Sequence, residues 1–350
     1  MKFQYIIILA GLFIHFPFFV RASVPDSSKA ITAETKHRTV SSKVVHDPVM
    51  IKEGKIYYVL GTGRGISVKR SADRIHWTNI NPVFVDSINF PAWHRVDIPD
   101  QNRQLWAPDI HYSNGLFHLY YAVSVWMNFK SSIGYATNKT LDQKSPDYHW
   151  VDKGKIIDFR NGGEGVNCID PNIFIDHDGK EWLFYGSFKS GLRMVELNPK
   201  TGKLLNQHPK LYTITTGLGE GVFVVKANGF YYIFASRGKC CAGLKSTYEI
   251  VVGRSKKLKG PYLNKKGESW VDNHYTVFLA GDYDEPGRGH NGFFTERDTT
   301  FIVYHAYTRS ANGASLLNIK PVYVGKDGWP TMEPTGKIFF AHSNLINLVQ

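Results

Sequence analysis

The feature of this sequence that most constrains its fold is a pattern of residues that recurs along most of its length. Each clear copy begins with an acidic residue, continues as a short apolar strand, turns at a glycine and returns as a strand with alternating aromatic residues. Four clear copies begin at Asp47, Asp109, Asp170 and Glu220, and a weaker fifth begins at His290. Recurrence of this kind predicts an architecture assembled from similar units.

Each copy has the pattern of a β-hairpin. Asn114-Gly115, Asp178-Gly179 and Asn228-Gly229 stand at the turns, where such pairs supply the positive φ angles of two-residue hairpin loops. The flanking residues alternate with period two, as expected for strands with one buried face. Further short strands are expected at residues 66–69 and 250–253.

The distance between copies indicates how many strands each unit holds. The first residues lie 62, 61, 50 and 70 positions apart, which leaves room for about four strands per unit. Aromatic residues at 14% and 32 glycines also favour short strands and tight turns. We therefore predict an all-β fold, a five-bladed β-propeller. A β-sandwich is the alternative, but it gives no reason for an acid to head successive hairpins.

The N-terminal residues have the pattern of a secretory signal. An apolar run over residues 5–14 follows Lys2, and His15 and Pro17 interrupt it, so a stable membrane span is not expected. We expect a secreted or periplasmic protein. The predicted boundaries are a signal peptide at 1–22, a linker at 23–39 and one propeller domain at 40–350.

The net charge of +12 permits attraction to acidic partners. The basic residues are scattered, however, and the densest group is Lys256, Lys257 and Lys259. No nucleic-acid-binding motif accompanies them, so no nucleic-acid partner is expected. The sequence also has no His-Glu-x-x-His or paired Cys-x-x-Cys motif that would indicate a zinc hydrolase.

The three cysteines leave at least one thiol unpaired. Cys240 and Cys241 are adjacent, and a bond between them would close a strained ring. Two adjacent thiols, or one bond to the distant Cys168, are the alternatives. The sequence does not choose among them.

The acidic residues at the start of the copies are candidate catalytic residues. The innermost strand of each propeller blade lines the axial channel, so Asp47, Asp170 and Glu220 are expected to meet around one pocket. Asp109 is interpreted as structural. Glycoside hydrolysis needs one carboxylic acid to protonate the leaving oxygen and one carboxylate to activate water. A third carboxylate can raise the pKa of the acid by like-charge repulsion.

Several short motifs accompany these acids between about Val45 and Pro330. They are His46-Asp47-Pro48, Trp106-Ala107-Pro108-Asp109, Ile169-Asp170-Pro171-Asn172, the Glu220 hairpin, Cys240-Cys241-Ala242-Gly243 and Gly289-His290-Asn291. Together they resemble glycoside hydrolase family 43, and within it they are most similar to the endo-1,5-α-L-arabinanases. The resemblance implies a five-bladed propeller and a glycosidase that inverts configuration and acts on arabinan.

The resemblance also implies roles for individual residues. Asp47 resembles the general base of the family, Asp170 the residue that modulates the pKa of the acid, and Glu220 the general acid. His290 resembles a histidine that holds a hydrated calcium ion, whereas its chemistry alone favours a neutral hydrogen-bonding side chain, because calcium prefers about 6–8 oxygen ligands. No organic cofactor is expected. The implied substrate-binding residues are His46, Trp106, Asn167 and Ser187.

Two positions depart from the family pattern. Gly221-Val222 stands where relatives commonly have Gly-Pro or Ala-Pro, and Lys189 stands where they often have Trp. The predicted function is endo-hydrolysis of α-1,5-linked arabinan, in plant cell walls or on pectin side chains, by a monomer. The alternatives are an exo-acting α-L-arabinofuranosidase or β-xylosidase, and a catalytically silent glycan-binding propeller.

Overall fold

The computed structural model describes residues 42–85, 88–163, 165–217 and 219–341. The predicted signal peptide at 1–22 and linker at 23–39 lie outside these residues. All the described residues belong to one compact unit, Val40–Gln350. No helix within them is long and apolar enough to cross a membrane.

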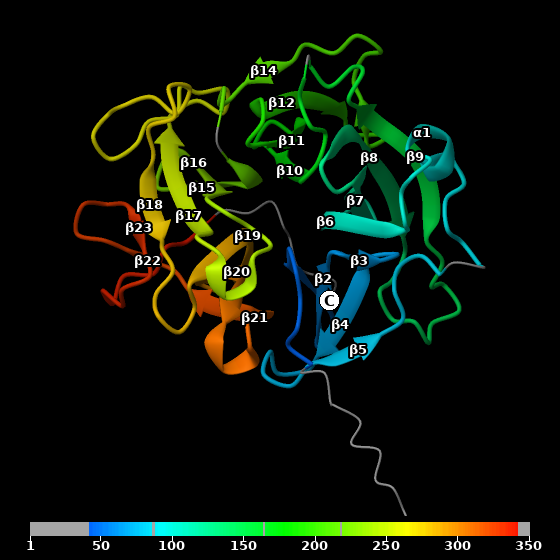
Figure 1. Cartoon of the computed structure of the whole chain (residues 1–350), viewed down its shortest axis with the longest axis horizontal. Coiled ribbons are helices and arrows are strands. Elements are labelled where there is room, and N and C mark those ends of the chain that lie inside the picture. The colour runs from blue at the N-terminus through cyan, green and yellow to red at the C-terminus, as the bar shows by residue number, and fades with distance from the viewer. Residues whose placement is uncertain (1–41, 86–87, 164, 218, 342–350) are drawn as a thin grey trace, which may run out of the picture. The chain divides into compact units, whose positions relative to one another are not determined.

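Within the described residues, five β-sheets surround a central axis as the blades of a propeller, which confirms the predicted all-β, five-bladed fold (Figure 1). The first blade contains β1 (Val49–Glu53), β2 (Ile56–Gly61), β4 (Ser67–Ser71) and β5 (Thr78–Ile80). The second contains β3 (Gly63–Arg64), β6 (Gln104–Ser113), β7 (Leu116–Val125), β8 (Asn128–Asn138) and β9 (Val151–Asp158), and the short helix α1 (Trp93–Asp97) precedes β6.

The other three blades follow in chain order. The third contains β10 (Asn172–Ile175), β11 (Glu181–Ser187), β12 (Gly191–Asn198), β13 (Lys203–Leu204) and β14 (Tyr212–Thr213). The fourth contains β15 (Glu220–Ala227), β16 (Phe230–Arg237), β17 (Glu249–Ser255) and β18 (Thr276–Leu279), with a 3₁₀ turn at Gly243–Lys245. The fifth contains β19 (Gly287–Glu296), β20 (Thr299–Thr308) and β21 (Ala314–Pro321), with a 3₁₀ turn at Arg309–Ala311, and the pair β22 (Tyr323–Val324) and β23 (Pro330–Thr331) comes after it. The strands expected at 66–69 and 250–253 correspond to β4 and β17.

Two of the predicted hairpin turns are confirmed and one is wrong. Asn114-Gly115 and Asn228-Gly229 form two-residue loops in which all four residues have positive φ. The loop with Asp178-Gly179 is longer, because the last pair of β10 and β11 is Ile175 with Glu181. The wider loop begins with Asp176, whose carboxylate accepts a hydrogen bond from Tyr231 of the fourth blade.

The ring is closed by a short segment that comes before the first blade. The backbone N–H of Val45 donates to Ser315 O at 3.0 Å, and that of Leu317 donates to Lys43 O at 2.8 Å. Residues 43–45 therefore pair with the outer strand β21 of the last blade. The chain then continues directly into β1, so this pairing ties the first blade to the fifth and protects the edge of β21.

The core is divided among the contacts between blades. Five clusters of buried apolar side chains each fill the space between two neighbouring blades. Val59 of β2 and Val303 of β20, for example, belong to the cluster between the first and fifth blades. Because apolar burial stabilises each of these contacts, the inner strands are held at fixed positions around the axis.

Candidate active site

The site is built on a backbone feature that all five blades share. One residue near the start of each inner strand has a positive φ, between 43° and 59°, and regular strand pairing begins two residues later. Such a backbone is costly for residues other than glycine, and it is concentrated at functional sites in proteins. The five residues are Asp47, Ala107, Asp170, Gly221 and His290.

This feature corrects the alignment of the repeats that the sequence indicated. Asp47, Asp170 and His290 occupy the shared position, but Glu220 lies one residue before it and Asp109 lies two residues after it. In the second, fourth and fifth blades, the pairing of the inner strand is irregular at this point. The additional residues change the number of positions between the acidic residue and the start of regular pairing. The acids at the heads of the copies are therefore not all equivalent.

Asp47, Asp170 and Glu220 nevertheless line one pocket of about 390 Å³ at the centre of the ring. His46, Trp106 and His290 line the same pocket. The other two expected substrate-binding residues do not line it. They pair with each other instead, because Nδ2 of Asn167 donates to Oγ of Ser187 at 3.4 Å, and both residues are buried.

Asp109 lies outside this pocket and connects two blades. Its Oδ2 accepts hydrogen bonds from the backbone N–H of Ile173 at 2.6 Å and from Nδ2 of Asn172 at 3.2 Å. These bonds join β6 to β10. Burial raises the pKa of Asp109 to about 6. Its placement agrees with a structural role.

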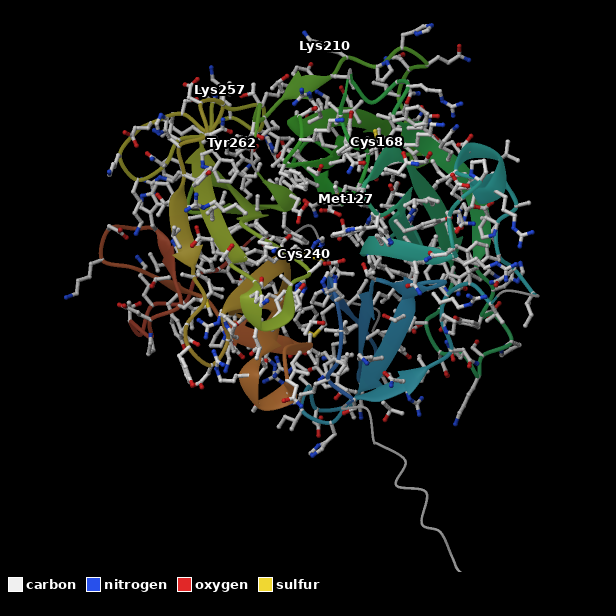
Figure 2. All side chains as sticks on the ribbon, viewed as in Figure 1. Met127, Cys168, Lys210, Cys240, Lys257 and Tyr262 are labelled. Atoms are coloured by element: carbon white, nitrogen blue, oxygen red, sulfur yellow. A yellow bond between two sulfur atoms is a disulfide. The ribbon has the colours of Figure 1, made fainter. Side chains whose placement is uncertain are left out.

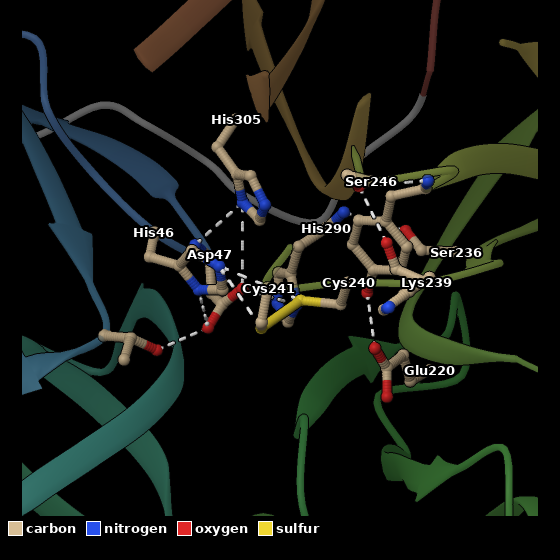
Figure 3. Close-up of a disulfide and its surroundings, with 12 residues drawn as sticks. His46, Asp47, Glu220, Ser236, Lys239, Cys240, Cys241, Ser246, His290 and His305 are labelled. Carbon is tan, nitrogen blue, oxygen red and sulfur yellow. Dashed lines mark hydrogen bonds and ion pairs between the residues drawn. A yellow bond between two sulfur atoms is a disulfide. The ribbon is translucent and has the colours of Figure 1, made fainter. Parts of the chain in front are cut away.

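Asp47 is surrounded by histidines, as Figure 3 shows. Its Oδ2 lies 2.9 Å from Nδ1 of His46, and its Oδ1 lies 3.3 Å from Nδ1 of His290. Thr62 donates its hydroxyl hydrogen to Oδ2 at 2.5 Å. Burial alone would raise the pKa of Asp47, but the neighbouring imidazoles, first of all His46, outweigh burial and hold it well below its usual range. Asp47 is therefore a carboxylate at every physiological pH.

His305 fixes the backbone beneath this carboxylate. Its Nδ1 accepts the N–H of Asp47 at 3.1 Å, so Nδ1 carries no proton and the proton of the neutral ring is on Nε2. Burial lowers the pKa of His305 well below its usual value, which agrees with a neutral ring. Nε2 is buried and has no hydrogen-bond partner among the described residues.

The opposite side of the pocket contains two carboxyl groups. Tyr248 donates its hydroxyl hydrogen to Oε1 of Glu220 at 2.8 Å, and the N–H of Gly221 donates to Oδ2 of Asp170 at 2.9 Å. Burial, together with the charge of Asp47, raises the pKa of Glu220 to about 7. Burial and then the charges of Glu220 and Asp47 raise the pKa of Asp170 well above its usual value. Glu220 thus holds a proton that it can release near neutral pH.

A disulfide between Cys240 and Cys241 forms part of the wall between these two sides (Figure 3). Both sulfur atoms lie 3.8 Å from Nε2 of His46, and the N–H of Cys241 donates to the hydroxyl of Tyr307 at 2.9 Å. Among the alternatives that the sequence left open, the structure therefore has the bond between neighbours. Cys168 is a free, buried thiol between the second and third blades (Figure 2).

The residues around His290 offer few ligands for the expected calcium ion. Within the described residues, two groups bring three possible metal ligands within 4.8 Å, His46 with Cys240 and Cys241 and His46 with Asp47 and His305, and neither includes His290. Burial lowers the pKa of His290, so its ring is neutral and a nitrogen can act as a ligand. One imidazole beside one carboxylate fits calcium only as an ion whose shell is mostly water.

Sequence reasoning missed three residues that hold the acids in place. They are Thr62, Tyr248 and His305, which contact the side chain of Asp47, the side chain of Glu220 and the backbone of Asp47 respectively. Tyr248 belongs to the Ser246-Thr247-Tyr248 segment, whose polar residues are a usable signal. Thr62 and His305 have no recognisable sequence signal. Thr62 follows β2 and His305 lies on β20, and only the folded chain brings them next to Asp47.

The arrangement combines two carboxyl groups of opposite protonation. Asp47 is ionised and can accept a proton, and Glu220 is protonated up to about neutral pH and can donate one. A pair of groups whose pKa values are pushed apart in this way is suited to acid and base catalysis across one bond.

Comparison with known proteins agrees with this chemistry. The sequence profile of the glycosyl hydrolases family 43 matches residues 37–330. The chain is 36% identical over 302 residues to an extracellular exo-alpha-(1->5)-L-arabinofuranosidase of Cellvibrio japonicus, covering 83% of this chain and 86% of that protein. It is 34% identical over 328 residues to the extracellular endo-alpha-(1->5)-L-arabinanase 1 of Bacillus subtilis, covering 91% of this chain and 97% of that protein.

A solved structure is similar over the same region. The alpha-L-arabinanase of Cellvibrio cellulosa, in complex with arabinohexaose, superimposes with a TM-score of 0.79 at 35% identity. The match covers 83% of this chain and 95% of that chain.

Proposed function

The chain belongs to glycosyl hydrolases family 43, and we propose that it hydrolyses α-1,5-linked L-arabinan with inversion of configuration. Membership makes the protein a glycosidase of the arabinanase type. The observation that best supports the proposal is the single pocket in which Asp47 is ionised and Glu220 is protonated.

The proposed reaction is a direct displacement by water. Asp47 takes a proton from a water molecule, whose oxygen attacks the anomeric carbon of the sugar. The bond from that carbon to the leaving oxygen breaks, and Glu220 donates its proton to the leaving oxygen. One proton is taken up by Asp47 and one is released by Glu220, so the charges of the two groups exchange without a net change.

We assign Asp170 the modulation of Glu220. The two carboxyl groups act on each other electrostatically inside a buried site, where they cannot both be ionised at little cost. The N–H of Gly221 that Asp170 accepts belongs to the residue after Glu220, so Asp170 also positions the strand that carries the acid. A Cβ at Gly221 would lie 3.0 Å from Nδ1 of His290, so a larger residue would disturb both sides of the pocket.

We further propose that the enzyme is exported and cleaves internal bonds of plant cell-wall arabinan. The signal-like residues 1–22 and the extracellular relatives support export. The relative from Bacillus subtilis is named for endo action, and the one from Cellvibrio japonicus is named for exo action, so exo hydrolysis is the second candidate. A hydrated calcium ion held by His290 would add positive charge near the carboxylates.

Product analysis over time tests the proposal. The purified protein is incubated with linear arabinan, and the products are separated by chromatography. Mixed oligosaccharides from the first minutes are expected for endo action, and one small product from the start would support exo action. If arabinan is bound but no product forms, the protein is a glycan-binding propeller and the catalytic assignment is wrong.

A further inference from the structure

A line of hydrogen bonds runs from the loop after β16 through Tyr307 and His46 to Asp47. The backbone N–H of Cys241 donates to the hydroxyl oxygen of Tyr307 at 2.9 Å. That hydroxyl lies 2.8 Å from Nε2 of His46. On the other side of the same imidazole, Nδ1 lies 2.9 Å from Oδ2 of Asp47 (Figure 3). Segments of three blades therefore meet in one line, and its last member is the carboxylate proposed as the base.

The hydroxyl of Tyr307 suits both protonation states of His46. When the ring is neutral, the proton of Tyr307 is donated to Nε2, and the ring proton is on Nδ1, facing the carboxylate. When the ring is charged, Nε2 donates to Tyr307 and Nδ1 still donates to Asp47. Burial lowers the pKa of His46, but the charge of Asp47 outweighs burial and places this pKa above its usual value. In either state, the Nδ1 proton lies on Oδ2.

Tyr307 also fixes which way the ring of His46 is turned. The ring stacks on His305 with centroids 4.1 Å apart, and a half-turn of the imidazole within this stack would keep its plane. The half-turn would place carbon atoms where Nδ1 and Nε2 now lie, so the contacts with Asp47 and Tyr307 would both be lost. Among the described residues, the other atoms near Nε2 are the two sulfur atoms of the disulfide at 3.8 Å, which are weak partners.

The two oxygen atoms of Asp47 consequently have different surroundings. Oδ2 accepts hydrogen bonds from the hydroxyl of Thr62 and from Nδ1 of His46. Oδ1 accepts no hydrogen bond from a described residue, and the nitrogen atoms nearest to it are Nδ1 of His290 at 3.3 Å and Nδ1 of His305 at 3.7 Å. The latter carries no proton, because it accepts the N–H of Asp47. Asp47 lines the acid pocket, so Oδ1 is the oxygen that can accept a hydrogen from water.

We propose that Tyr307 is a positioning residue, which holds the Nδ1 proton of His46 on Oδ2 of Asp47 and leaves Oδ1 to take the proton of the attacking water. One O–H bond of the water breaks and a new O–H bond forms at Oδ1. The electron pair left on the water oxygen forms the bond to the anomeric carbon. Tyr307 is buried and does not line the acid pocket, so it acts through His46 and not on the substrate. The inference rests on the proposed function and adds which oxygen acts and what orients it.

Tyr307→Phe tests this role kinetically, because it removes only the hydroxyl group. We expect kcat on arabinotriose to fall about tenfold, while KM changes less than about twofold. In a His46→Asn background, the amide can still donate to Oδ2 but is too short to reach Tyr307, so Tyr307→Phe should have no further effect. Such non-additivity indicates that one residue acts through the other. Equal losses in both backgrounds, or a change in KM alone, would overturn the role.

A measurement without substrate tests the same contact. The Nδ1 proton of His46 is identified in proton–nitrogen NMR spectra as the imidazole signal that His46→Asn removes. Its exchange with water should be about tenfold faster in Tyr307→Phe, because the ring can then turn away from Asp47. An unchanged exchange rate would show that Tyr307 does not hold His46. Thermal unfolding shows whether each variant is folded.

The matched control is Tyr304→Phe. Tyr304 is a buried tyrosine on the same strand, β20, and its hydroxyl contacts neither His46 nor Asp47, so kcat and the exchange rate should stay at their wild-type values. The same losses in this control would mean that any buried hydroxyl on β20 matters, and the role of Tyr307 would be wrong. A wild type that does not hydrolyse arabinan would overturn the proposed function, whereas the exchange measurement would still decide whether Tyr307 holds His46.

Discussion

The two sides of the central pocket contain the same kind of group in opposite states. On one side, Asp47 lies within 4 Å of three histidine rings, and its pKa is held far below the usual range. On the other side, the hydrogen-bond donors to Glu220 and Asp170 among the described residues are neutral, and the pKa of each carboxyl group is raised. Burial raises the pKa of all three carboxyl groups, so the difference between Asp47 and the other two comes from their neighbours.

The comparison also explains why the sides are not interchangeable. A base must be ionised and an acid must be protonated at the same pH, and identical surroundings would give both groups the same state. Asp47 and Asp170 even share the same positive-φ backbone position on their blades. The histidines contributed by the first and fifth blades are therefore the feature that keeps Asp47 ionised.

Removal of the base should have the largest effect. Asp47→Ala is expected to reduce kcat on arabinan by about 10⁴-fold, because no other ionised carboxylate among the described residues lines the pocket to accept the proton of water. Steady-state kinetics give the value, and circular dichroism shows whether the fold is kept. Azide should restore turnover of an aryl arabinoside. A variant that keeps more than a tenth of the wild-type activity would show that Asp47 is not the base.

Loss of the acid should depend on the substrate. Glu220→Gln is expected to lower kcat on arabinan by about 10³-fold, but that on an aryl arabinoside by about tenfold, because a good leaving group needs little protonation. The ratio of the two losses is the measurement. The wild-type rate should also fall as pH rises through about 7, where Glu220 loses its proton, and this limb should vanish in the variant. Equal losses on both substrates would contradict the acid role.

Substitution of Asp170 should change the pH profile more than the chemistry. In Asp170→Asn the carboxyl group that is electrostatically coupled to Glu220 is lost, so the alkaline limb of kcat/KM is expected to move to lower pH and kcat to fall about tenfold. Asp109→Asn is the matched control, since Asp109 is also buried with a raised pKa but lies between blades. Its alkaline limb should stay in place. An unmoved limb in Asp170→Asn would mean that burial and Asp47 alone set the pKa of Glu220.

Removal of a bound metal ion should have the smallest effect on activity. EDTA is expected to reduce activity a few-fold or to lower the unfolding temperature, with recovery on addition of calcium, if His290 holds a hydrated ion near Asp47. His290→Ala should show the same loss and no further response to EDTA. Elemental analysis of the untreated protein that finds no metal, together with full activity in EDTA, would leave His290 as a neutral neighbour of Asp47.

The sequence determined the class of fold because its signal is local and repeated. Alternating aromatic strands and Asn-Gly turns need only a few consecutive residues to be recognised, and the five copies indicated five blades. The longer loop at 176–180 was missed, and its first residue, Asp176, contacts Tyr231 on another blade, which the local sequence pattern does not contain. The three acids were found because each stands near the start of a copy. The sequence alignment of the copies was nevertheless wrong at Asp109 and Glu220, which do not occupy the backbone position that Asp47 and Asp170 share.

Only the tertiary structure decided how those acids are charged and what surrounds them. Asp47 is ionised because imidazoles, first of all His46, lie around it, and 258 residues separate Asp47 from His305 in the chain. The position of the Cys240–Cys241 disulfide beside His46 likewise depends on how the blades close into a ring. Sequence patterns specify strands through neighbouring residues, whereas a pKa depends on every charge and on the water within a few ångströms, and folding brings those together from all five blades.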